Sequence, residues 1–82
     1  MIINLDINTS FVNTLICLSS IIYHHLDENR TIDELYDLCQ NVYSENKIEL
    51  ILTYDDIVEA LLLLFSVGKI ELINDGKVAK TL

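Results

Sequence analysis

The side chains of this 82-residue chain that could carry chemistry are few, and their spacing does not favour a reactive site. His24 and His25 are the only histidines, and adjacent helix positions face different directions. Metal ligands on one helix need a spacing of three or four residues. Cys17 lies on roughly the same face as His24, but no third ligand aligns with them. We therefore expect no metal ion, and expect Cys17 and Cys39 to be free, reduced thiols in the core.

The acidic residues fit helix starts better than they fit a catalytic site. Asp33 and Glu34, like Asp55 and Asp56, fall in the first turn of a predicted helix, where the helix dipole favours negative charge. No serine has the context of a nucleophile elbow, and with only two glycines the chain has no glycine-rich phosphate loop. The sequence thus predicts no catalytic residue and no cofactor, so we do not expect an enzyme.

A net charge of −8, from 13 acidic and 5 basic residues, restricts the class of partner. An acidic surface repels phosphate, so it disfavours binding to nucleic acid and to anionic membranes. No apolar run approaches the roughly 20 residues that span a bilayer, and no signal peptide is recognisable. We expect a cytoplasmic protein that alone binds neither nucleic acid nor membrane. A basic partner, or a soluble acidic module, fits this charge.

Hydrophobic periodicity predicts one α+β domain over residues 1–82, a winged helix-turn-helix with three helices, a C-terminal β-hairpin and a short N-terminal strand. The strand is expected at Ile2–Ile7, and the first helix from about Ser10 to Leu26. This helix is apolar over more than half of its circumference, which predicts burial on two sides. The second side could be covered by another chain.

A capping box from Thr31 to Glu34 predicts the start of the second helix, which should run to about Tyr43 or Ser44. Tyr43 is expected to cover an edge of the core with its hydroxyl in water. The connection Asn46–Leu52 includes the alternating run KIELIL, so we expect a short strand there.

The third helix should begin after Thr53 as N-cap and end before Gly68 in a left-handed conformation. Its buried stripe is expected to consist of four residues at helical spacing: Ile57, Ala60, Leu61 and Leu64.

The predicted hairpin begins with the strand Lys69–Leu72 and turns at Asp75-Gly76. This two-residue turn sets a register that places Glu71 opposite Lys80 as a cross-strand salt bridge. The same register pairs Leu72 with Ala79, and Ile73 with Val78.

The opposite face of the third helix is the candidate functional site. A DNA-reading helix would carry Arg, Lys, Asn or Gln on this face. Here the face consists of Asp55, Glu59, Leu62, Leu63 and Ser66. Two leucines with a polar rim have the composition of a protein interface. The alternative is that one of the two leucines packs internally, against the first helix or the hairpin.

Several segments resemble a known family. They are the N-terminal strand with its apolar helix, TIDELYDLC at 31–39, DIVEALLLLFSVGKIEL at 56–72, and the terminal hairpin. Together they resemble the small middle components of bacterial ABC-three-component conflict systems, some of which serve in Lamassu-type anti-phage defence. The strongest likeness is the run from Ala60 to Leu72. The resemblance implies a winged-helix subunit without catalytic residues, which bridges an SMC-like ABC ATPase and an effector, often a nuclease.

Two other functions are compatible with the sequence. The fold permits a DNA-binding transcriptional regulator, although the acidic charge argues against it. The other function is that of a small homodimeric structural protein, which would bury the first helix against its own copy. We expect the protein–protein adaptor.

Overall fold

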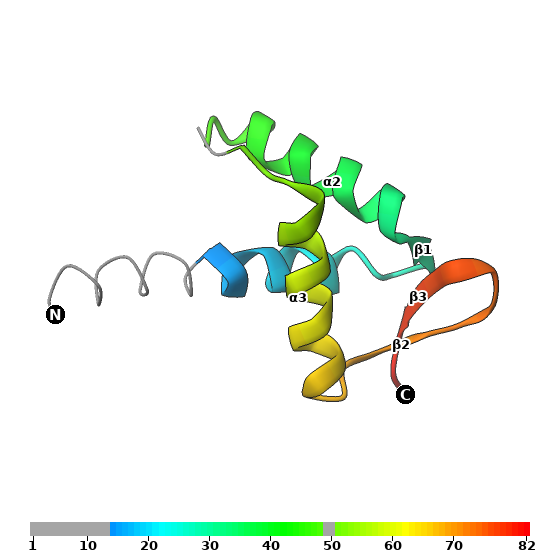
Figure 1. Ribbon diagram of the computed structural model, residues 1–82. Coiled ribbons are helices and arrows are strands. Elements are labelled where there is room, and N and C mark those ends of the chain that lie inside the picture. The colour runs from blue at the N-terminus through cyan, green and yellow to red at the C-terminus, as the bar shows by residue number, and fades with distance from the viewer. Residues whose placement is uncertain (1–13, 49–50) are drawn as a thin grey trace, which may run out of the picture.

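The computed structural model describes residues 14–48 and 51–82, which form a winged-helix-like arrangement of three helices and a three-stranded antiparallel sheet. Figure 1 shows α3 crossing the first helix near the middle of the molecule, with α2 above them and the hairpin at one side. The expected strand at Ile2–Ile7 and the expected helix start at Ser10 lie outside the described residues.

The first helix covers 14–24 of the described residues and ends two residues before the predicted Leu26. A turn follows, in which the His25 N–H donates to the carbonyls of Ile21 and Ile22 at 3.1 Å. Ser19 is buried, and its hydroxyl is satisfied inside the helix by donating to the Leu15 carbonyl at 2.8 Å.

The third strand of the sheet comes from a segment that the sequence did not predict. β1 (Arg30–Thr31) pairs antiparallel with β3 (Lys77–Lys80), with Arg30 opposite Val78. A two-residue strand is too short to show alternation. By contrast, the described residues of Asn46–Leu52 form no strand, so they do not show the strand expected there. Residues 49–50 lie outside the described residues.

Arg30 anchors the link between the first helix and β1. Its Nε donates to the His25 carbonyl at 2.8 Å, and its guanidinium lies 3.6 Å from both Asp27 and Glu28. Because the carboxylates are exposed, these ion pairs orient the chain more than they stabilise it.

α2 (Ile32–Glu45) begins with the predicted capping box. The Glu34 N–H donates to Thr31 Oγ1 at 3.2 Å, and the Thr31 N–H donates to Glu34 Oε1 at 2.8 Å. The bond from the backbone of Thr31 lowers the pKa of Glu34 because it favours the carboxylate form. Tyr43, expected at an edge of the core, is instead only 4% exposed.

α3 (Tyr54–Ser66) begins with a second capping box, in which Thr53 and Asp56 exchange hydrogen bonds of 3.2 and 2.9 Å. It ends before Gly68, whose φ of 74° is the left-handed conformation predicted for it. The Lys69 N–H then donates to the Leu64 carbonyl at 2.9 Å and closes the helix end. All four residues of the predicted stripe are buried.

The hairpin of β2 (Ile70–Leu72) and β3 differs from the prediction by one residue of register. Leu72 lies opposite Val78 and Glu71 opposite Ala79, so the predicted Glu71–Lys80 salt bridge is wrong. The loop is Asn74–Gly76 rather than two residues. This register places the buried Ile70 and Val78 on one face of the sheet, whereas a one-residue shift would turn Glu71 toward the core.

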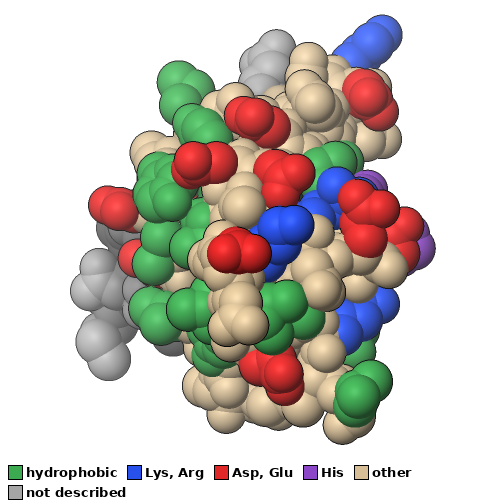
Figure 2. Space-filling model, turned by 90° about the vertical axis from the view of Figure 1, so that its right-hand side faces the viewer, with side chains coloured by type: hydrophobic (Ala, Val, Ile, Leu, Met, Phe, Trp, Pro, Cys, Tyr) green, Lys and Arg blue, Asp and Glu red, His purple; other side chains and the backbone are tan. Residues whose placement is uncertain are grey.

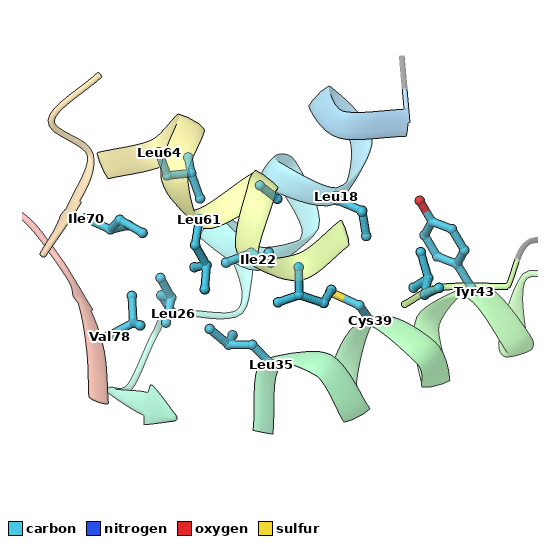
Figure 3. Packing of buried hydrophobic residues seen from close by; sticks show 13 residues of the cluster. Leu18, Ile22, Leu26, Leu35, Cys39, Tyr43, Leu61, Leu64, Ile70 and Val78 are labelled. Carbon is cyan, nitrogen blue, oxygen red and sulfur yellow. The ribbon is translucent and has the colours of Figure 1, made fainter. Parts of the chain in front are cut away.

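The core lies where the three helices meet the sheet, and Figure 3 shows its side chains pointing toward one another from all four elements. Its largest fully buried members are Leu18, Ile22, Leu35, Ile57, Val78 and Cys39. Cys39 is the core thiol that was predicted, but Cys17 is exposed, which corrects the expectation for it. Within 14–48 and 51–82, no helix is both long and apolar enough to cross a bilayer.

Candidate protein-binding face of α3

α3 presents four of the five predicted site residues along its outward side. Asp55, Glu59 and Ser66 are exposed, and Leu62 is 60% exposed. The neighbouring Leu61 is only 2% exposed. The two leucines differ because successive side chains on a helix are turned by about 100°, which takes Leu61 into the core and Leu62 into solvent. Leu62 is therefore an apolar side chain in water that contributes little to the domain's own core.

Leu63 does not belong to the same surface as Leu62. It is half-buried and lines a groove of about 250 Å³ between the first helix and the end of α3. This is the outcome that the sequence left open for one of the two leucines. Ser66 is also occupied locally, because its hydroxyl donates to the Leu63 carbonyl at 2.7 Å. The outward face is thus Leu62 with the acids Asp55 and Glu59 on the preceding turns.

An apolar extension of this face, at the start of α3, was missed by the sequence reasoning. It is Tyr54, 44% exposed at the first position of the helix, whereas Ile51, 89% exposed, precedes the helix. The ring of Tyr54 stands edge-on to Tyr36, with 5.9 Å between centroids. The spacing of Tyr54, Val58 and Leu62, four residues apart, is the signal that could have identified the extension.

Tyr36 holds this end of α3 in place. Its hydroxyl donates to the Leu52 carbonyl at 3.2 Å and accepts from Gln40 Nε2 at 2.8 Å. Partial burial and the neighbouring Asp33 carboxylate raise the pKa of Tyr54, since both disfavour a phenolate there. The Tyr54 ring is therefore an uncharged aromatic edge beside Tyr36.

The charges of the helices and of the hairpin differ in sign. α2 and α3 carry acids in their first turns and no basic residue in their last turns. Lys69, Lys77 and Lys80 lie in or beside the hairpin. Figure 2 shows hydrophobic side chains gathered mainly at one side of this face, with acidic side chains spread across it and few basic ones.

The described residues offer no group of three or more His, Cys, Asp or Glu side chains arranged to hold a metal ion. Comparisons with protein-family models, curated proteins and solved structures find no match for this chain. The outward face of α3 provides an exposed leucine, an aromatic edge and acids. These groups suit contact with a protein better than contact with a phosphate backbone.

We expect the isolated chain to retain no duplex DNA in a gel shift at about 50 mM salt, the condition most favourable to phosphate contacts. The reason is the net charge of −8 and the lack of Lys or Arg on α3. An established winged-helix DNA-binding protein serves as the positive control. Retention of any duplex at micromolar protein would support the transcriptional regulator instead.

Proposed function

We propose that this chain is a non-enzymatic adaptor of the cytoplasm that binds another protein through the outward face of α3. The observation that carries the proposal is Leu62, 60% exposed on the helix that reads DNA in regulators of this shape, beside acids rather than bases. An exposed apolar side chain within a polar rim is the anatomy of a protein interface.

The proposed partners are an SMC-like ABC ATPase and an effector subunit, as the sequence resemblance implies. The two runs that carry the resemblance, 31–39 and 56–72, correspond to the start of α2 and to α3 with β2. The run 56–72 contains Glu59 and Leu62 of the candidate face and Leu63, Leu64 and Lys69 of the groove beside it, so this run covers residues that would contact a partner.

The acids of the outward face favour a basic surface on that partner. Asp55 and Glu59 are exposed, so their charges are screened by salt and act mainly on the rate of association. Leu62, which would be covered in the complex, is the residue expected to control dissociation.

The experiment is co-purification of the chain with the products of the genes adjacent to its own. Leu62→Glu should weaken the complex by about tenfold or more, since it places a charge in the centre of the contact. Leu72→Glu is the matched control, because Leu72 is 62% exposed but lies on the hairpin. A complex that survives Leu62→Glu, or that Leu72→Glu disrupts equally, would contradict the proposal.

A further inference from the structure

A groove separates the first helix from the end of α3 and has a volume of about 250 Å³. Its walls are mostly apolar. The residues that line it are Ile16, Ser19, Ser20 and Tyr23 from the first helix, Leu63 and Leu64 from α3, and Lys69. Ile16 is 52% exposed at its edge, so the groove opens to solvent beside an uncovered aliphatic side chain.

The charge of this groove is opposite in sign to the net charge of the chain, which has 13 acids and only 5 bases. Within 14–48 and 51–82, no acidic side chain lines the groove. Lys69 forms part of the wall, and Lys80 Nζ lies 4.5 Å from the centroid of the Tyr23 ring. Among the described residues both ion pairs belong to Arg30, and neither Lys69 nor Lys80 forms one.

We propose that this groove is a second docking site, which takes an apolar side chain from an acidic helical segment of a partner protein. An apolar depression between two helices is the shape that accepts one face of an amphipathic helix. The carboxylates of such a segment would pair with Lys69 and with Lys80 above Tyr23.

The two surfaces of the domain thus select opposite charges. The outward face of α3 is acidic, whereas the groove is basic at its rim. Leu63 and Leu62 are adjacent in sequence but serve different surfaces, so one small domain could hold two partners at once. Binding in the groove does not require the interface proposed on the outward face of α3.

The test uses two synthetic helical peptides with identical leucines, one carrying Glu and the other Lys at the remaining exposed positions. Each is titrated into the ¹⁵N-labelled full chain and followed by NMR. The Glu peptide should shift the amide signals of Ser20, Tyr23 and Lys69, and bind at least tenfold more tightly than the Lys peptide. Equal affinities measured from these three signals, or shifts confined to other parts of the chain, would overturn the proposal.

Charge reversal separates the groove from general electrostatics. Lys69→Glu with Lys80→Glu should weaken binding of the Glu peptide by at least tenfold. Lys47→Glu with Lys77→Glu gives the same net charge at exposed positions that do not line the groove, and should weaken it much less. Equal loss in both double variants would overturn the proposal. Leu62→Glu should leave peptide binding unchanged, so a failure of the α3 interface is distinguishable from a failure of the groove.

Discussion

Leu61→Glu is expected to unfold the domain, whereas Leu62→Glu should leave it folded. Leu61 is 2% exposed and packs within the core, where an unpaired carboxylate costs several kcal/mol. Small domains are stable by only about 5–15 kcal/mol, and one of this size is expected near the lower end. Leu62 is 60% exposed, so its replacement should change the free energy of unfolding by less than about 0.5 kcal/mol.

The measurement is thermal unfolding of both variants by circular dichroism. For Leu62→Glu the melting temperature should stay within a few degrees of the unmodified protein. Leu61→Ala provides the milder core variant and should cost about 2–5 kcal/mol, so it remains measurable where Leu61→Glu does not fold. If Leu62→Glu lowered stability as much as Leu61→Ala does, Leu62 would belong to the core, and the proposed interface on α3 would be wrong.

Stability is expected to fall steeply above pH 9, because of two buried groups that resist ionisation. Burial, with a smaller contribution from Cys17, raises the pKa of the Cys39 thiol from 9.0 to about 11. Below pH 9 the thiol keeps its proton in both states and contributes no pH dependence. Between pH 9 and 11 the unfolded chain loses this proton while the folded chain keeps it, so the free energy of unfolding decreases with pH.

The expected loss from Cys39 is about 2 kcal/mol by pH 11, where the folded thiol is itself half ionised, because burial raises its pKa from 9.0 to about 11. Tyr43 acts in the same direction at higher pH. Burial first, and then a hydrogen bond with Cys17, raise the pKa of its phenol from 10.0 to about 12. The contribution of Tyr43 to the free energy of unfolding is therefore lost between pH 10 and 12.

Urea unfolding at pH 8, 9.5 and 10.5 measures this loss. Cys39→Ala should be less stable than the unmodified protein at pH 8, since it leaves a cavity, but should lose less stability between pH 8 and 10.5. Cys17→Ser, at an exposed thiol, should keep most of the pH dependence because burial is the main cause. A pH profile that is the same with and without the Cys39 thiol would refute this account.

Local signals in the sequence were enough to place α2 and α3. Thr31 and Thr53 bond to the third residue of the helices that they start, so the cap depends on side chains within a few positions. Gly68 supplies the left-handed residue after α3. The stripe from Ile57 to Leu64 follows from helical periodicity alone, and all of its predicted members are buried.

Contacts between distant segments decided the rest. β1 is a strand only because β3 pairs with it, and two residues carry no pattern of their own. The hairpin register depends on which face of β2 and β3 meets the core, so it is set by the burial of Ile70 and Val78 rather than by the turn sequence.

The candidate site shows the same division. Helical periodicity placed Leu62 and Leu63 together on the side away from the stripe. The first helix lies against that side, beside Leu63, and leaves Leu62 uncovered. It also brings Tyr23 under Lys80 and creates the groove. The angle of a side chain about its own helix is a local property, but whether it meets solvent depends on where the next helix packs, which only the tertiary structure determines.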